Sequence, residues 1–434
     1  MVFRGALKNN DILVSRAGSV GISYRISKSD LLHRTVFASY LIRFCPLIPP
    51  TFVEHYFNSH HYWQYISDSQ LGIAVPNVNA TKLSELPFLL PPLNEQIRIV
   101  AKLDQIIPRI DLLKERLDRI PAIIKRFRQS LLMAAVTGKL TERWRTNHPD
   151  FDSPLWIKSK NNKIISHEVY RSEWNEIDIP ENWNCLHLKE VADLRLGKML
   201  DGVKNTGVEL EYIRNVNVRW FQFELDDLKT IRLRQEEVIK LSIKNGDVFI
   251  CEGGEPGRAA VWQSGENKMT FQKALHRVRF HGNVEPYWLV YNLKLDADTD
   301  RLSRLFTGST IKHFTGRSLA EYLLLLPPLE EQKEIVRQVE KLFALADKLE
   351  SHYQKAKARV DKLSQSILAK AFRGELVITE AELAEKEGRV FESAEKLLDR
   401  ILEEKAKLSG NKKSTVPRRS VKGRKNTERK YMDR

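Results

Sequence analysis

Side chains that could perform catalysis are few in this chain and stand in unsuitable patterns. The group that most resembles a metal site consists of Glu54, His55, His60 and His61. Its spacing differs from the His-Glu-x-x-His pattern, which places two histidines one helical turn apart so that both can bind zinc. We therefore expect this chain to use neither a metal nor any other cofactor.

A glycine-rich segment, Glu252-Gly253-Gly254-Glu255-Pro256-Gly257-Arg258, could bring backbone amides close to a ligand. It lacks the Gly-Lys-Ser/Thr ending of a phosphate-binding P-loop and does not match the dinucleotide fingerprint. Amino methylation of a base would need an Asn/Asp-Pro-Pro-aromatic motif, and the sequence contains none. The sequence therefore predicts a chain without enzymatic activity of its own, in which this segment is either a tight loop or part of a binding surface.

The charge of the chain indicates a polyanionic partner. Its 434 residues include 71 Lys and Arg against 56 Asp and Glu, which gives a formal net charge of +15. Basic groups that bind phosphates release condensed counterions, so nucleic acid is the first candidate and an anionic membrane the weaker one. The apolar runs at 86–93 and 323–329 are too short to span a bilayer. Three isolated cysteines, Cys45, Cys185 and Cys251, fit a reducing cytoplasm.

An internal repeat organises the elements that would position such residues. Leu90-Pro91-Pro92-Leu93-Asn94-Glu95-Gln96 returns as Leu326-Pro327-Pro328-Leu329-Glu330-Glu331-Gln332, at an offset of 236 residues. Lys8–Ile12 matches Lys244–Val248 at the same offset. Each copy therefore predicts a globular stretch, a Pro-Pro boundary and a long helix that ends near Gly138 or Gly374.

The two long segments have apolar residues at steps of three and four, as in a coiled-coil seam. The seam of the second copy consists of Val336, Val339, Phe343, Ala346, Leu349, Tyr353, Ala356, Val360, Leu363 and Ile367. The same positions in the first copy include Ile110, Leu117, Ile124 and Leu131. About 45 residues at 1.5 Å each predict rods of roughly 65 Å. We expect Leu349 and Leu363 to be buried in the seam.

Two prolines distinguish the rods. Pro108 and Pro121 lie inside the first rod, where the second has Ala344 and Lys357. An interior proline removes a backbone hydrogen bond and kinks a helix, so we expect only the first rod to bend. By their pattern alone the rods also fit a dimerisation or spacer coil. A coiled-coil scaffold without sequence-specific DNA binding is therefore the alternative function.

Several short segments and their order resemble one known family. The doubled Pro-Pro-Leu-x-Glu-Gln is accompanied by Leu196–Leu200, Tyr212–Val218, Cys251–Arg258, Phe271–Arg277 and Phe306–His313. Together they resemble the specificity subunits of type I restriction-modification systems, from near the start of the chain to about Leu408. The resemblance implies an α+β fold, with two globular target-recognition domains of mixed β-sheet and helix separated by two long antiparallel coiled-coil helices.

The resemblance also implies a function and partners. Each domain would read one half of a bipartite site in double-stranded DNA, and the rods would set the spacing of the half-sites. Methyltransferase subunits and restriction/translocase subunits would carry the chemistry, and this chain would direct them. No membrane partner is expected, and the location would be the cytoplasm.

The domain boundaries expected from the repeat are as follows. They are 1–91 for the first target-recognition domain, 92–140 for the first long helix, 141–327 for the second target-recognition domain, 328–376 for the second long helix, 377–408 for a C-terminal helix and 409–434 for a basic tail.

Base readout in the major groove uses Arg or Lys for guanine and Asn or Gln for adenine, with further basic groups on phosphates. The segments that carry the resemblance supply Lys198, Arg214, Asn215, Asn217, Arg258, Gln272, Lys273, His276, Lys312 and His313 in the second domain. Arg258 and Lys273 are favoured because a glycine-rich backbone allows close approach. A histidine such as His276, taken by itself, is more often a strand residue with satisfied hydrogen bonds than a base reader.

The C-terminal segment has two parts. Thr379 to Leu408 predicts one amphipathic helix, with its apolar stripe through Leu383, Phe391, Leu397, Leu398 and Ile401. Residues 409–434 carry ten Lys or Arg against two acidic residues, a net charge of +8. Such a block is either a solvated tail or an additional non-specific contact to DNA.

The repeat also reveals an imbalance at the beginning of the chain. Met1 aligns with Glu237, so the first domain has no counterpart of residues 183–236, a span of 54 residues that includes Lys198, Arg214, Asn215 and Asn217. An error in the start site, a frameshift or a real truncation would each explain this. We expect an incomplete first domain that exposes apolar surface and reads its half-site poorly.

Overall fold

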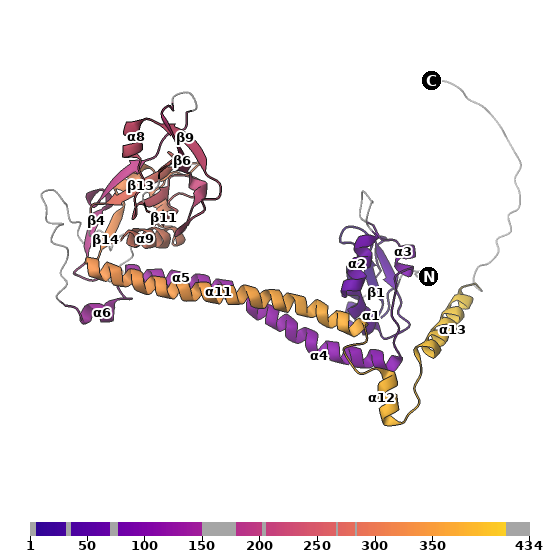
Figure 1. Cartoon of the computed structure of the whole chain (residues 1–434). Helices are drawn as coiled ribbons and strands as arrows, with labels where there is room; N and C mark the ends of the chain where they lie inside the picture. Colours follow the sequence, from indigo (N-terminus) through magenta and orange to yellow (C-terminus); the bar gives the residue numbers. More distant parts are fainter. Residues whose placement is uncertain are drawn as a thin grey trace, which may run out of the picture. The chain divides into compact units, whose positions relative to one another are not determined.

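The computed structural model describes residues 6–31, 36–69, 77–149, 179–201, 205–265, 268–282 and 284–413. The chain divides into two compact units (Figure 1). Unit 1 comprises residues 1–118 and 354–434, and unit 2 comprises residues 119–353. Helix α11 (Leu329–Phe372) runs through the boundary. Each unit therefore contains one globular domain and its own part of the rods.

The larger sheet of unit 2 has four antiparallel strands in the order β11-β10-β13-β5. These are β11 (Ala259–Val261), β10 (Val248–Cys251), β13 (Leu275–Phe280) and β5 (Ala192–Leu196). The Val-Phe-Ile-Cys run of β10 is apolar throughout because both faces of this sheet are covered. Ile250 faces a core that contains Trp288 of α9 (Pro286–Asp298). Phe249 faces a second core on the other side.

A smaller sheet covers the second core. Its order is β12-β6-β9, formed by β12 (Met269–Phe271), β6 (Val208–Ile213) and β9 (Lys229–Leu233), with β12 parallel to β6. Two further pairs join β4 (Asn184–His187) to β14 (Leu323–Leu326) and β7 (Val218–Arg219) to β8 (Gln222–Phe223). The short helices are α6 (Glu142–Thr146), α8 (Gln235–Lys240), α10 (Gly316–Ala320) and the 3-10 helices η3 (Leu188–Glu190), η4 (Asn215–Asn217) and η5 (Leu302–Leu305).

The domain of unit 1 is built on a three-stranded antiparallel sheet in the order β2-β1-β3. Its strands are β2 (Ser23–Arg25), β1 (Ile12–Ser15) and β3 (Leu41–Phe44). The helices are η1 (Ser29–Leu31), α1 (Pro50–Phe57), α2 (His60–Asp68) and α3 (Ala80–Ser84). Val14 of β1 shares a core with Phe52 of α1 and with Ile99 of α4 (Leu93–Asp118). The rod is thus part of the core of this domain.

The internal repeat is a structural repeat. At the offset of 236 residues β1 corresponds to β10, β2 to β11, the start of α1 to that of α9, and α3 to α10. Strand β3 corresponds to β13 at an offset of 234, because Ser15 pairs with Leu41 as Cys251 pairs with Leu275. Both domains therefore use the same order of strands around an equivalent central strand. In the described part of unit 1, no strand corresponds to β5, β6 or β9.

The rods pack antiparallel inside each unit. In unit 1, Ile99 near the start of α4 shares a core with Leu368 near the end of α11, and Asp118 at the end of α4 pairs with Lys357 at 2.6 Å. In unit 2, Arg128 of α5 (Ile120–Val136) pairs with Asp347 of α11 at 2.6 Å. The expected α+β fold with antiparallel long helices is confirmed.

The first rod is interrupted and the second is not. Helix α4 ends at Asp118 and α5 begins at Ile120, immediately before Pro121. Helix α11 continues for 44 residues without a proline. Pro108 remains inside α4 and does not end it. The expected difference between the rods is therefore found at Pro121 alone.

The predicted seam was wrong at two leucines. Ile110, Ile124 and Leu131 are buried, with exposed fractions of 2%, 6% and 6%. Leu349 and Leu363 are 51% and 42% exposed. Two further predicted positions, Leu117 and Ile367, are half-buried.

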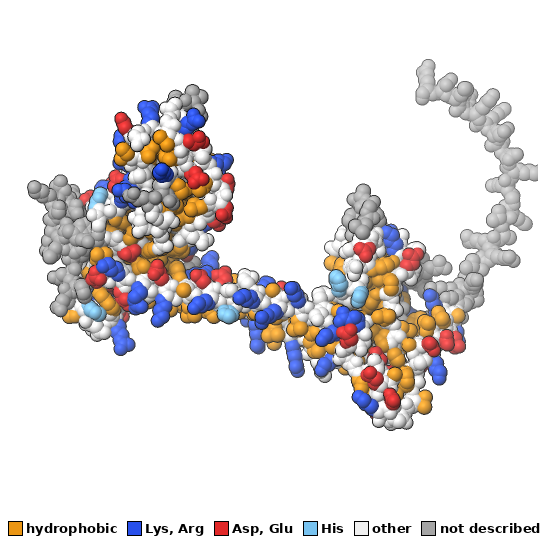
Figure 2. Space-filling view, viewed as in Figure 1, with side chains coloured by type: hydrophobic (Ala, Val, Ile, Leu, Met, Phe, Trp, Pro, Cys, Tyr) orange, Lys and Arg blue, Asp and Glu red, His pale blue; other side chains and the backbone are white. Residues whose placement is uncertain are grey.

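The error lies in the order of the steps. From buried Ala346 the seam advances four residues to half-buried Glu350 and then three to buried Tyr353, so that Leu349 turns outward. A step of four residues followed by one of three has the same period as a step of three followed by one of four. Because Glu350 is polar, a search for apolar residues selects Leu349 and so predicts the wrong order of steps. Figure 2 shows Lys and Arg side chains along the rods beside exposed hydrophobic ones.

The C-terminal segment forms two helices where one was expected. Helix α12 (Glu380–Glu387) ends at Gly388, whose φ is 61°, and α13 (Ala394–Lys413) follows. A left-handed residue stops an α-helix, and glycine adopts that conformation without a steric penalty. Leu397 is buried as expected, whereas Leu398 is exposed. The basic tail beyond residue 413 lies outside the described residues.

Candidate DNA interface

Loops from distant parts of unit 2 meet at one end of its four-stranded sheet, around the glycine-rich loop Glu252–Arg258. The backbone N–H of Glu252 donates to the carbonyl oxygen of Ala274 at 2.9 Å, and the N–H of Phe314 donates to the carbonyl oxygen of Glu252 at 2.8 Å. Arg258 Nη2 donates to the carbonyl oxygen of Asn215 at 2.9 Å. Three segments far apart in the sequence are thus held around one loop.

A second set of hydrogen bonds adds the segment after β5. The N–H of Lys198 donates to the carbonyl oxygen of Phe271 at 2.9 Å, and the N–H of Lys273 donates to that of Lys198 at 2.8 Å. A Cβ on Gly197 would lie 2.3 Å from the carbonyl oxygen of Gln272, so this close approach requires glycine. The fold therefore brings together the segments that contain the ten predicted contact residues.

Three of the predicted basic residues have acidic partners. Arg214 Nη2 lies 2.6 Å from Asp227 Oδ2, and Arg258 Nη1 lies 2.7 Å from Glu255 Oε2. Lys198 Nζ pairs with Glu237 and thereby lowers the pKa of that carboxyl group. To contact DNA, each of these cations must either share its hydrogen-bond donors between its carboxylate partner and a base or phosphate, or leave the carboxylate for a phosphate. The sequence analysis missed the acidic partners, although Glu255 stands only three residues before Arg258.

Four other predicted side chains have no side-chain partner among the described residues. Lys273, Lys312 and His313 are exposed, and Gln272 is half-buried. His313 lies beside the glycine-rich loop, because a Cβ on Gly253 would be 3.4 Å from its Nδ1 atom. An amide can recognise adenine, and an ammonium group can bind guanine or phosphate. These four side chains need no exchange of partners to reach DNA.

Asn217 and His276 are corrected to structural positions. Asn217 is 3% exposed, and its Oδ1 accepts the N–H of Arg214 at 2.9 Å. His276 is 2% exposed, its Nε2 lies 2.9 Å from the carbonyl oxygen of Phe314, and burial lowers its pKa. Both side chains shape the loops and have no free surface for a base. Asn215 remains half-buried at the site, where its Nδ2 lies 3.4 Å from the carbonyl oxygen of Gly253.

Unit 1 contains a second copy of the central loop. We call the loops Ser15–Ile22 and Cys251–Arg258 the paired loops. In unit 1 the N–H of Ser15 donates to the carbonyl oxygen of Ile22 at 2.9 Å, and in unit 2 the N–H of Cys251 donates to that of Arg258 at 2.8 Å. Gly21 and Gly257 have φ values of 88° and 87°.

The neighbours of the paired loops are also equivalent. The N–H of Arg16 donates to the carbonyl oxygen of Tyr40 at 2.9 Å, as Glu252 does to Ala274. The N–H of Val78 donates to the carbonyl oxygen of Arg16 at 3.1 Å, as Phe314 does to Glu252. The same backbone arrangement therefore occurs in both units.

No metal site accompanies these loops in the part of the chain that the structure describes. No group of three His, Cys, Asp or Glu side chains is suitably placed there. Of the histidines in the expected candidate group, His55 has its Nε2 atom 3.0 Å from Asp104 Oδ1. Across the same residues, no helix is both long and apolar enough to cross a membrane.

Comparison with known proteins identifies one family. The family model described as Type I restriction modification DNA specificity domain matches residues 6–122 and 180–357. The Type I restriction enzyme EcoKI specificity subunit of Escherichia coli (strain K12) is 31% identical over 387 residues, which cover 86% of this chain and 76% of that relative. The EcoBI specificity subunit of Escherichia coli is 32% identical over 361 residues, 81% of this chain and 72% of the relative.

Solved structures share the fold. The HsdS subunit from Thermoanaerobacter tengcongensis aligns with a TM-score of 0.53 at 20% identity, covering 87% of this chain and 84% of that one. A chain solved in work on complex assembly and conformational transition of the type I R-M system aligns with a TM-score of 0.57 at 18% identity, covering 86% and 83%. Each of the two stretches that match the family model contains one of the paired loops.

Proposed function

The chain belongs to the family of type I restriction-modification specificity subunits, and we propose that its two units read the two halves of a bipartite site in double-stranded DNA. It is a non-catalytic DNA-recognition subunit. The observation that carries the proposal is the pair of equivalent loops, one in each unit, on the same backbone arrangement. A protein that reads two half-sites needs two reading surfaces, and duplication supplies them.

In unit 2 we assign the contacts to the surface formed by Lys198, Arg214, Asn215, Arg258, Gln272, Lys273, Lys312 and His313. Cations held by Asp227, Glu255 and Glu237 are oriented before DNA arrives. Free side chains such as Lys273 and Gln272 supply base or phosphate contacts directly. The expected domains, with target recognition in 1–91 and 141–327 and long helices in 92–140 and 328–376, follow this assignment.

The partners that we propose are methyltransferase subunits and restriction/translocase subunits. They carry the methylation and cleavage that this chain directs, and the rods set the spacing of the half-sites. The chain alone then has no methyltransferase, nuclease or ATPase activity.

Comparison of the methylated positions in the genome with and without the gene for this chain tests the proposal. Loss of methylation at one bipartite motif is the expected result, while the methylating subunit is still produced. A coiled-coil scaffold without sequence-specific binding, the alternative function, would leave the pattern of methylation unchanged. An unchanged pattern would therefore contradict the proposal.

A further inference from the structure

The paired loops have the same backbone arrangement but different side chains. Arg16 of unit 1 stands where unit 2 has Glu252, and Ile22 stands where unit 2 has Arg258. In the neighbouring segment Tyr40 takes the place of Ala274. At these three positions unit 1 thus has an arginine and two large side chains, and the position of the DNA-contact candidate Arg258 carries an isoleucine.

The guanidinium group of Arg16 is not neutralised. No acidic side chain lies within ion-pair distance of it among the described residues. The loop 15–22 and the segment 36–42 contain no Asp or Glu, whereas the loop of unit 2 carries both Glu252 and Glu255 beside Arg258. The loop of unit 1 therefore presents a single positive charge, which attracts an anionic partner.

The backbone on both sides of this side chain is fixed. The Arg16 N–H is bonded to Tyr40 and its carbonyl oxygen accepts the N–H of Val78. Ile22 and Tyr40 are 54% and 57% exposed. Large exposed apolar groups beside a charge displace water when a partner binds, and this strengthens hydrogen bonds from the guanidinium group.

We propose that Arg16 reads a guanine in the first half-site, with Tyr40 and Ile22 packed against the adjacent nucleotide. This inference rests on the proposed function. The planar fork of arginine donates two hydrogen bonds to O6 and N7 of guanine, which is the commonest specific contact in the major groove. The sequence-based expectation that unit 1 reads its half-site poorly considered only counterparts of residues in 183–236. Arg16 lies on the paired loop of unit 1 at the position of Glu252, which is not among the residues assigned to DNA contact in unit 2.

The test uses the complex of the full chain with its methylating subunit. Affinity is measured for duplexes in which each base pair of the bipartite site is changed in turn. Arg16→Ala should reduce discrimination against the changed base roughly 5- to 150-fold at one guanine of one half-site. Arg16→Lys should retain affinity for unrelated DNA while losing most of that discrimination, because lysine keeps the charge but lacks the fork. Preferences in the other half-site should be unchanged.

Lys28→Ala is the matched control, because Lys28 is exposed and follows β2 at the end away from Ile22. It removes the same charge from the same domain and should leave every base preference intact. If Arg16→Ala left every base preference unchanged, the inference would be overturned. The proposed function would stand, because the unaltered complex would still select its site. A uniform loss of affinity without a change in preference would also overturn it, because Arg16 would then be a phosphate contact. An unaltered complex without any base preference would overturn the proposed function as well.

Discussion

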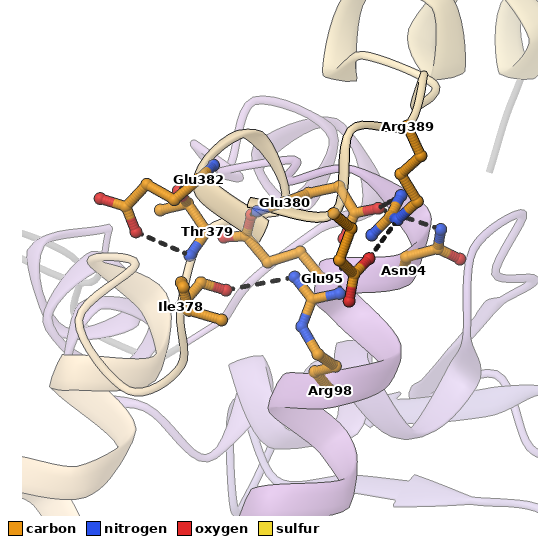
Figure 3. Close-up of polar contacts among 9 residues, drawn as sticks. Asn94, Glu95, Arg98, Ile378, Thr379, Glu380, Glu382 and Arg389 are labelled. Atoms are coloured by element: carbon orange, nitrogen blue, oxygen red, sulfur yellow. Dashed lines mark hydrogen bonds and ion pairs between the residues drawn. The ribbon is translucent and has the colours of Figure 1, made fainter. Parts of the chain in front are cut away.

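The backbone N–H of Glu380 donates to Oε2 of Glu95 at 2.8 Å (Figure 3). Glu95 belongs to the first Pro-Pro-Leu-x-Glu-Gln segment, and its counterpart in unit 2 is Glu331. Glu331 accepts a hydrogen bond from Thr141 Oγ1 at 2.8 Å. Each of these buried glutamates thus binds the segment that follows the opposing rod helix in its own unit. The repeated motif fixes the point where the chain leaves the rod.

Replacement of Glu331 should destabilise unit 2 strongly. Its carboxylate is fully buried and binds Thr141, the indole N–H of Trp183 at 2.9 Å and the guanidinium group of Arg145. Glu331→Ala leaves buried donors without an acceptor, which costs about 3–5 kcal/mol. Glu330→Ala is the control, because the exposed pair with Lys333 contributes about 0–1 kcal/mol. Urea unfolding measures both, and equal losses would contradict the role of Glu331.

Docking of α12 should fail in acid. Hydrogen bonds from Arg389, and also from Arg98 and Asn94, lower the pKa of Glu380 from 4.5 to about 2. A carboxyl group whose pKa is lowered by folding stabilises the folded state fully when the pH is above its pKa in the unfolded chain. For Glu380 this stabilisation is lost as the pH falls from about 4.5 towards 2. We expect protection from hydrogen exchange at residues 378–389 to decrease over that interval.

Glu380→Gln should reduce the protection of residues 378–389 already at neutral pH. In this variant the protection should no longer change as the pH falls from about 4.5 to 2. Glu385→Gln is the control, since Glu385 is exposed on the same helix. If protection in Glu380→Gln still fell over the same pH interval as in the unaltered chain, Glu380 would not be the group responsible for the acid dependence.

Two leucines test the corrected seam. Leu131 is 6% exposed and packs in the main core of unit 2, whereas Leu349 is 51% exposed. Leu131→Ala should cost about 2–5 kcal/mol of unfolding free energy, because it leaves a cavity. Leu349→Ala should change the unfolding free energy by no more than about 0.5 kcal/mol, as is usual for a surface position. If urea unfolding gave the larger loss for Leu349→Ala, the seam derived from the sequence pattern would be the correct one.

Lys273 tests the reading surface of unit 2. Its side chain is exposed where its backbone N–H is bonded to Lys198, and it has no side-chain partner among the described residues. In the complex with the methylating subunit, Lys273→Ala should reduce discrimination between bases in one half-site by about 1–3 kcal/mol, because it removes a base contact. Lys268→Ala, an exposed change immediately before β12, is the control. Equal effects of the two changes would assign only general charge attraction to Lys273.

The sequence alone determined the repeat, and with it the order of the elements. The match around Glu95 and Glu331, with six identities in seven residues, and the apolar run Val248–Cys251 follow local rules of period and turn chemistry. Because those rules act within a few residues, they predicted the rods and the interruption at Pro121. They also gave the family resemblance, since its segments are short and ordered along the chain.

Only the tertiary structure decided which side of a helix faces inward and which charges are paired. Glu350 enters the seam in place of Leu349 because the opposing helix, with Arg128 2.9 Å from Glu350, determines the direction of that face. Local sequence cannot specify a partner that lies more than 200 residues away. The contact of Arg258 with Asn215 depends in the same way on loops that meet only after folding, and so does the absence of an acidic partner of Arg16 among the described residues.

The two glutamines of the repeated motif show this limit most clearly. Gln332 and Gln96 are identical in the sequence pattern, and their Nε2 atoms donate to Pro327 at 2.8 Å and to Pro91 at 2.7 Å. Oε1 of Gln332 accepts the N–H of Glu285 at 2.8 Å, whereas Oε1 of Gln96 is buried and accepts no hydrogen bond from the described residues. The residue equivalent to Glu285 is Pro49, which has no N–H to give. The motif determined where each glutamine lies, and the packing of α1 or α9 against it decided whether its hydrogen bonds are complete.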